Sequence, residues 1–307
     1  MAQFKTSKRN INGVILLDKP LGYSSNQALQ KVKWLYQAAK AGHTGTLDPL
    51  ATGLLPICLG EATKFAQYVT DADKTYIATI KLGATTATGD AEGEVLTTSP
   101  VNITPAQFAA VCQQFVGEIS QVPPMYSALK HEGKALYTYA REGVDIARQP
   151  RLITINAIAV NEFLGETAQI TVSCSKGTYI RTLAEDIGAA LGCGAHLNGL
   201  CRTETAGYLL AQAVTIEQLE AMTAEARDAL LLPVDSAIES LPKVVLNTDC
   251  AYFLLQGQAV WQAGKVPNSD LRLYDENNQF LGLGFLQDDG KIAPKRLIKA
   301  SDSSKKP

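Results

Sequence analysis

The chain has 307 residues, of which 46% are hydrophobic and 19% are charged, so it can bury a large core and is too apolar to be disordered. Its formal net charge of −2 excludes a global attraction to nucleic acid, so any RNA binding must come from local clusters of Lys and Arg. The N-terminus has no apolar stretch long enough for a signal peptide or a membrane span, and we expect a cytoplasmic protein.

Cysteine and histidine spacing argues against a metal centre. The six cysteines form no CxxC pair, and most of them lie in apolar runs where a thiol behaves as a small hydrophobic group. None of the three histidines has the i,i+4 partner typical of a helical metal site. We therefore expect neither a disulfide framework nor a bound metal.

The first half of the chain predicts alternating strands and helices. Residues 13–20 predict a strand that enters a loop, and the apolar spacing after Ser25 predicts an amphipathic helix. Residues 75–82 and 169–175 alternate as half-buried strands do. Thr104 predicts the N-cap of a helix that ends before Gly117.

The second half predicts one further helix and then a small β-rich unit. Thr215 and Gln218 have capping-box spacing, which predicts a helix running toward Leu232 that closes the first domain. Beyond Pro242 we expect a strand at 244–246, a helix at 248–256 and two strands around a turn at Asn277 and Asn278.

The segment GHTGTLDPLATGLLPICLGEATK, residues 42–64, is the most informative part of the chain. Its glycines and prolines interrupt an apolar run around one carboxylate, Asp48. Pro49 restricts Asp48 to an extended backbone, which presents the carboxylate on a rigid loop. An ordinary Asp-Pro turn is the alternative reading of these residues alone.

The chain resembles the TruB family, the bacterial tRNA pseudouridine-55 synthases, from about Gly13 to Gly207 and more weakly beyond. The segment around Asp48 is similar to the catalytic-aspartate motif of that family. Two departures are Ser24, where many members have Thr, and Leu136, where a basic residue is common. Five further motifs occur in the family's order: LDKPLGYSS, KTYIATIKLG, TATGDAEGEV, PPMYSALKHEGKALYTYAREG and SKGTYIRTLAEDIG.

The resemblance implies a mixed α/β (α+β) protein of two domains. A catalytic domain of the pseudouridine-synthase fold is expected over residues 11–240. A small β-rich, PUA-like RNA-binding domain is expected over 243–300, and its composition alone fits a packing module equally well. Residues 301–307 are polar and are expected to form a disordered tail.

The same resemblance implies the residues of the active site. Asp48 would be the essential carboxylate, Arg181 its ion-pair partner and Tyr76 the residue stacked on the target uracil. The remaining residues implied at the uracil pocket and beside the extruded nucleotide are Tyr179, Leu200 and His43. Arg181 is also expected near the start of a helix, where the helix dipole opposes a cation and an anionic partner is needed.

The implied reaction is the isomerisation of uridine 55 in the T-loop of tRNA. The N-glycosidic bond breaks, the uracil turns, and its C5 atom bonds to C1′ of the same ribose. This chemistry requires an ionised carboxylate and neither a redox cofactor nor a metal. The residue types leave open whether Asp48 attacks C1′, adds to the uracil ring or acts as a base.

Basic residues in or next to the matched motifs are expected to contact RNA phosphates, although most such residues in proteins are simply solvated. These residues are Lys19, Lys64, Lys130, Arg141 and Arg202. Lys295 and Arg296 are further candidates for the acceptor stem.

Two other functions compete with the enzyme reading. A tRNA-folding chaperone would bind the same RNA without chemistry, and a metal-dependent nuclease would need grouped carboxylates that the sequence lacks. The absence of a coiled-coil pattern and the family resemblance predict a monomer with tRNA as its partner, no obligate protein partner and no membrane.

Overall fold

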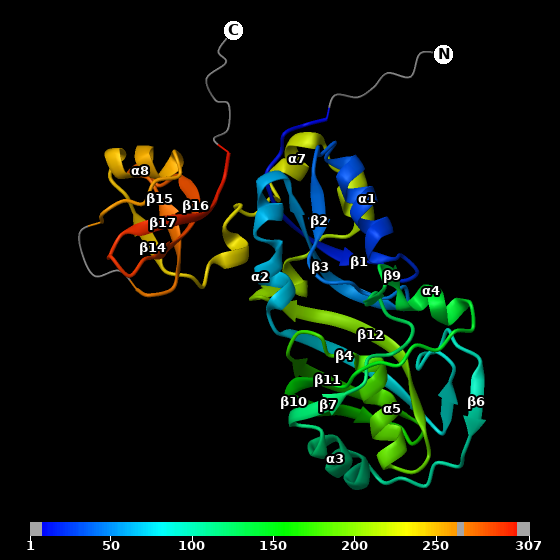
Figure 1. The fold of residues 1–307 in the computed structure, drawn as a ribbon. Helices are drawn as coiled ribbons and strands as arrows, with labels where there is room; N and C mark the ends of the chain where they lie inside the picture. Colours follow the sequence, from blue (N-terminus) through cyan, green and yellow to red (C-terminus); the bar gives the residue numbers. More distant parts are fainter. Residues whose placement is uncertain (1–7, 263–266, 300–307) are drawn as a thin grey trace.

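The computed structural model describes residues 8–262 and 267–299. Two units lie side by side in Figure 1, a large one built on a nine-stranded sheet and a small one on a four-stranded sheet that begins beyond Pro242. Within the described residues, no helix combines the length and the apolar character needed to cross a membrane. The predicted tail at 301–307 lies outside the described residues.

The large sheet is almost entirely antiparallel. Its strands are β1 (Gly13–Lys19), β2 (Ala41–His43), β3 (Ala51–Leu59), β4 (Lys74–Leu82), β7 (Gly117–Gln121), β10 (Arg151–Phe163), β11 (Thr167–Cys174), β12 (Ala195–Thr205) and β13 (Tyr208–Leu209). The order is β1-β3-β12-β4-β11-β10-β7, with β2 on β3 and β13 on β12. Among the named strands of this sheet in the described residues, β3 and β12 are the one pair that runs parallel. Two separate hairpins are β5 (Ala84–Thr86) with β6 (Val95–Thr98) and β8 (Lys130–His131) with β9 (Lys134–Ala135).

Helices cover the large sheet in two groups. The helices of this unit are α1 (Ser25–Leu35), α2 (Ala66–Asp71), α3 (Pro105–Gln114), α4 (Leu136–Arg141), α5 (Ile180–Ala190), α6 (Ile216–Ala221) and α7 (Ala224–Asp228), with 3-10 turns at Gly60–Lys64, Leu210–Gln212 and Ser236–Ile238. One group has α5 on β12 and β4, with α3 on β10 (Figure 1). The other has α1 against β2, β3 and α6.

Local sequence signals account for most of these elements. Thr104 forms the N-terminal capping box of α3, as predicted, and Ser24 forms that of α1. The prediction of one long helix after Thr215 is wrong, because the backbone turns to an extended conformation at Met222 and Thr223 starts a second helix. The hydroxyl of Thr223 accepts a hydrogen bond from the N–H of Ala226, so the second helix has its own cap.

Strand β12 joins the two halves of the large sheet. It pairs with β3 through residues 200–202 and with β4 along most of its length. The close approach to β3 requires Gly53, whose φ is +96° and whose added Cβ would lie 2.4 Å from the carbonyl oxygen of Arg202. Because β12 lies between β3 and β4, the loop before β3 comes close to residues of β4 and β12 at the centre of the sheet.

The small unit has its own core and contains the predicted strand, helix and pair of strands, followed by a strand, β17 (Ile292–Leu297), that the sequence pattern does not predict. Its other elements are β14 (Lys243–Val245), α8 (Thr248–Leu255), β15 (Asp270–Tyr274) and β16 (Phe280–Leu286). Asn278 has φ +61° in the turn before β16, as suits an Asn turn. The unit meets the large one at the ring pair Phe65–Phe280, whose centroids are 5.5 Å apart, and at a 2.6 Å hydrogen bond from the Tyr68 hydroxyl to Asp270.

The packing of α5 on β12 yields a stability prediction. A Cβ at Gly188 would lie 2.2 Å from the backbone nitrogen of Ala195 and 2.5 Å from the backbone carbon of Gly194. We expect Gly188→Ala to lower the free energy of unfolding by about 1–3 kcal/mol, although Ala otherwise favours a helix. Urea denaturation measures this change. Gly42→Ala is the control, since nothing lies within 4 Å of its Cβ position; equal stability of the two variants would contradict the close packing.

Candidate active site

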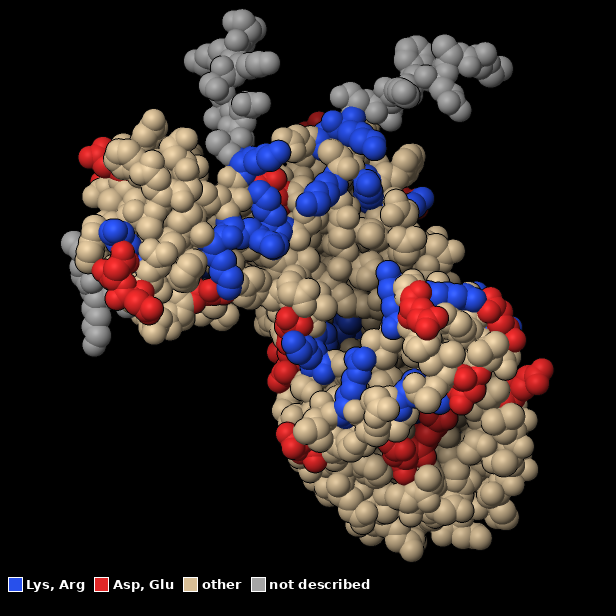
Figure 2. All heavy atoms as spheres, viewed as in Figure 1, with Lys and Arg blue, Asp and Glu red and all other residues tan. Residues whose placement is uncertain are grey.

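A cavity of about 330 Å³ opens where the loop before β3 faces β4, β12 and the start of α5. In Figure 2 the large unit is hollowed midway along its length, and Lys and Arg side chains gather around the hollow. Among the residues that line the cavity are Asp48, Tyr76, Tyr179, Arg181, Leu200 and Arg202. Residues from four distant segments of the sequence thus share one cavity.

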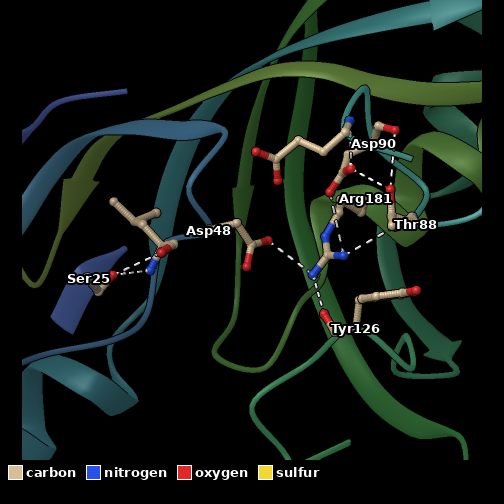
Figure 3. Close-up of polar contacts among 8 residues, drawn as sticks. Ser25, Asp48, Thr88, Asp90, Tyr126 and Arg181 are labelled. Atoms are coloured by element: carbon tan, nitrogen blue, oxygen red, sulfur yellow. Dashed lines mark hydrogen bonds and ion pairs between the residues drawn. The ribbon is translucent and has the colours of Figure 1, made fainter. Parts of the chain in front are cut away.

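The loop that carries Asp48 is held by Ser25. The buried hydroxyl of Ser25 accepts a hydrogen bond from the N–H of Leu47 at 2.7 Å and donates to the carbonyl oxygen of Leu47 at 2.9 Å. The carbonyl oxygen of Asp48 accepts from the N–H of Ala51 at 3.0 Å. These bonds fix the backbone on both sides of Asp48, and Figure 3 shows its carboxylate pointing toward Arg181.

Arg181 is a buried cation with two acidic partners. Its side chain is 6% exposed, and its Nη2 atom lies 3.0 Å from Oδ2 of Asp48. Its Nη1 atom lies 3.6 Å from Oδ2 of Asp90, on the opposite side of the guanidinium (Figure 3). The carbonyl oxygens of Thr88 and Tyr126 accept its remaining hydrogen bonds, at 3.2 and 2.6 Å. The predicted partner of this arginine, Asp48, is therefore in place.

The pKa of Asp48 reflects two opposing effects. Burial raises it above its ordinary value because the surrounding protein disfavours the charged form, while Arg181 lowers it by stabilising that form. Asp90 raises it further by charge repulsion. The side chain remains 41% exposed, on the side that faces the cavity. The carboxylate is thus held in one position yet open to a ligand.

Part of the cavity wall is aromatic and apolar. Tyr76 lies on β4 and is 8% exposed, Tyr179 is the N-cap residue of α5, and Leu200 lies on β12. Burial raises the pKa of both tyrosines, which keeps their phenols neutral. Two aromatic rings and one aliphatic side chain beside a carboxylate form a site suited to a planar base.

His43 does not line this cavity. It lies on β2, and its Nδ1 atom is buried with no hydrogen-bond partner in the described part of the chain. Burial and, secondarily, the nearby Arg202 lower the pKa of its imidazole, which favours the neutral form. Its assignment beside the extruded nucleotide stays a prediction.

Two of the predicted phosphate contacts need correction. Lys19 is fully buried, and its ammonium donates to the carbonyl oxygens of Pro20 and Tyr23; burial lowers its pKa to about 8. Arg202 is 1% exposed and donates to the carbonyl oxygens of Leu54 and Gly45. Lys19 satisfies carbonyl oxygens in the loop after β1, and Arg202 satisfies one on β3 and one in the loop before it. Arg202 still lines the cavity, but its buried guanidinium is bound to the backbone.

The other basic residues lie nearer the surface. Lys130 and Arg141 are exposed on β8 and at the end of α4. Lys64 bridges the two units, since its ammonium donates to Glu61 at 2.6 Å and to the carbonyl oxygen of Leu297 at 2.8 Å. The two C-terminal candidates are also engaged there, Lys295 with Asp270 at 2.6 Å and Arg296 with the carbonyl oxygen of Lys64 at 2.8 Å.

Residue-level reasoning missed several groups that build the site. The matched motif TATGDAEGEV contains Asp90, but the sequence assigns it no role, and it places Ser25 only at the start of a helix. Lys74 also lines the cavity, with its ammonium bound to the carbonyl oxygen of Thr70 at 2.6 Å. The acidic residue in a Gly-rich motif is the sequence signal that could have identified Asp90. The contacts of Ser25 and Lys74 depend on the tertiary structure and have no such signal.

Comparison with known families and proteins gives one answer along the whole chain. The family model described as TruB family pseudouridylate synthase, N-terminal domain, matches residues 33–180. The model described as tRNA pseudouridylate synthase B C-terminal domain matches 181–239, and that described as pseudouridine synthase II TruB, C-terminal, matches 242–298.

Individual relatives agree over nearly full length. The tRNA pseudouridine synthase B of Methylobacillus flagellatus is 64% identical over 97% of this chain and 98% of that protein, and that of Pseudomonas fluorescens is 52% identical over 98% of this chain and 100% of that protein. The crystal structure of a Cbf5-Nop10-Gar1 complex contains a chain with TM-score 0.70 and 28% identity, matched over 94% of this chain and 84% of that one. The predicted mixed α/β fold is confirmed, and the chain belongs to the TruB family of pseudouridylate synthases.

Proposed function

We propose that this chain converts uridine 55 in the T-loop of tRNA to pseudouridine, with Asp48 as the catalytic carboxylate. The observation that supports this proposal most strongly is the 3.0 Å ion pair between Asp48 and Arg181, in the wall of a cavity that Tyr76 and Tyr179 also line. The name of the relatives at 64% and 52% identity, tRNA pseudouridine synthase B, supports tRNA as the substrate and pseudouridine formation as the reaction. A chaperone without chemistry would not need a carboxylate fixed in this way.

Each part of the site has a separate task in the proposed reaction. Arg181 keeps Asp48 ionised and holds its Oδ2 atom at a fixed position, so the carboxylate needs little reorganisation as the glycosidic bond breaks. The guanidinium of Arg181 is itself held in place by Asp90 and by the carbonyl oxygens of Thr88 and Tyr126. It therefore does not move toward the cavity with the carboxylate. The uracil remains in the cavity while it turns and bonds through C5.

The cavity also explains how a base from a folded T-loop would be held. Extruding a base costs a few kcal/mol of stacking, which contact with Tyr76 and Tyr179 offsets in part. Leu200 adds an apolar contact that does not compete for hydrogen bonds with the base.

We further propose that the chain acts in the cytoplasm as a monomer, without an obligate protein partner.

The central prediction concerns the carboxylate itself. Asp48→Asn should abolish pseudouridine formation in an unmodified tRNA transcript and leave tRNA affinity unchanged or higher, because one negative charge leaves the RNA-binding cavity. Product is measured by nucleoside analysis and affinity by filter binding. Asp289→Asn, at an exposed turn of the small unit, is the control and should keep full activity. An active Asp48→Asn variant would exclude Asp48 as the catalytic group.

A second prediction concerns pH. Asp48 acts in its ionised form, so activity falls as pH falls through its pKa, which burial already raises and Arg181 holds down. Arg181→Met should therefore move the acid limb of the kcat profile to higher pH and lower kcat by about 100-fold at neutral pH. Arg181→Lys keeps the charge and should shift the limb less. Identical acid limbs for wild type and Arg181→Met would mean that the two side chains are not coupled.

A third prediction separates a surface cation expected to contact phosphate from one held in an ion pair on the sheet. Arg141→Gln should reduce the slope of log affinity against log salt by about 0.7–0.9, because one phosphate contact is lost. Lys81→Gln serves as the control, since Lys81 is paired with Glu166 at 2.6 Å on the sheet, and should leave the slope unchanged. Titrations of tRNA binding between low and moderate salt measure both slopes. An unchanged slope for Arg141→Gln removes this residue from the phosphate contacts.

A further inference from the structure

Gln121, the last residue of β7, binds one residue of the cavity wall through both ends of its side-chain amide. Its Oε1 atom accepts a hydrogen bond from the backbone N–H of Tyr179 at 2.8 Å. Its Nε2 atom donates to the carbonyl oxygen of Tyr179 at 3.1 Å. Gln121 is 2% exposed, so water cannot readily replace either bond. The backbone at Tyr179 is therefore held from both sides.

Tyr179 needs this support because of its place in the fold. It is the N-cap residue of α5, with φ −102° and ψ 108°, and its own side chain makes no capping bond within the described structure. A buried backbone N–H at a helix start that lacks a partner is costly. Gln121, 58 residues away in the sequence, supplies the missing acceptor. The local sequence around α5 gives no signal of this contact.

The same segment also fixes Arg181. The carbonyl oxygen of Tyr126, five residues after Gln121, accepts a hydrogen bond from Nη2 of Arg181 at 2.6 Å. That Nη2 atom is also the one that lies 3.0 Å from Asp48. The segment 121–126 thus holds the first turn of α5 at two points, the backbone of residue 179 and the guanidinium of residue 181. A shift at Tyr179 would displace the cation that orients Asp48.

We propose that Gln121 is a positioning residue for the isomerisation: its amide fixes the start of α5 and thereby the alignment of Arg181 with Asp48. This inference rests on the proposed function. The neutral amide satisfies both partners, since Oε1 faces an N–H and Nε2 faces a carbonyl oxygen. An ionised glutamate of the same size would place a second oxygen, without a proton, against the carbonyl oxygen of Tyr179.

The test compares Gln121→Glu with Gln113→Glu. Gln113 lies on α3, does not line the cavity, and donates to the carbonyl oxygen of Ile158 at 3.0 Å, so its variant carries the same chemical change at a hydrogen bond that does not involve Tyr179 or Arg181. We expect Gln121→Glu to lower the single-turnover rate of pseudouridine formation by about 10–100-fold, as small misplacements of catalytic groups do. Its Kd for tRNA should stay within about threefold of wild type, because Gln121 does not line the cavity. Gln113→Glu should keep the wild-type rate.

The outcomes separate this inference from the proposed function. Wild-type protein that forms no pseudouridine overturns both. With active wild type, a variant whose rate and tRNA affinity fall together overturns the positioning role alone. Gln121→Met, which removes both hydrogen bonds without adding charge, is measured in the same way and decides the case in which Gln121→Glu does not fold or keeps both bonds as a protonated acid. A wild-type rate in that variant also rejects the proposal.

Discussion

The site depends on one buried guanidinium that must be neutralised. Arg181 lies at the start of α5, where the helix dipole disfavours a cation, and it is almost fully removed from water. Two carboxylates and two carbonyl oxygens surround it, and one of those carboxylates, on Asp48, also faces the cavity. The interaction that satisfies the arginine is therefore the same one that positions a reactive group.

The fold brings these groups together from distant parts of the chain. Asp48 comes from the loop before β3, Asp90 from the turn after β5, and Arg181 from the start of α5 (Figure 3). The parallel contact between β3 and β12 places that loop beside Leu200, and β4 adds Tyr76 on the other side of β12. The pairing of β3, β12 and β4 at the centre of the sheet therefore also forms the cavity.

Local sequence patterns predict much of this structure. The capping boxes at Ser24 and Thr104, the alternating strands β4 and β11, and the order of the C-terminal elements all follow from periodicity and turn residues. The pairing of Arg181 with Asp48 followed from the family resemblance and from the unfavourable helix position of the arginine.

The remaining features depend on long-range contacts that composition does not encode. The interior positions of Lys19 and Arg202 are set by carbonyl oxygens of folded loops, so their residue type suggested a surface role that the structure does not give them. The contact of Gln121 with Tyr179 likewise joins residues that are far apart in the sequence, whereas the break at Met222 had a local signal, the N-cap Thr223. The polar contacts behind the cavity are the part that a sequence reading recovers least well.

The most direct measurement is a nucleotide-resolution map of pseudouridine in an unmodified tRNA transcript after incubation with the purified chain. The proposed function predicts a single new pseudouridine, at position 55 of the T-loop. A transcript without pseudouridine, or one modified elsewhere while uridine 55 stays unchanged, would contradict the account.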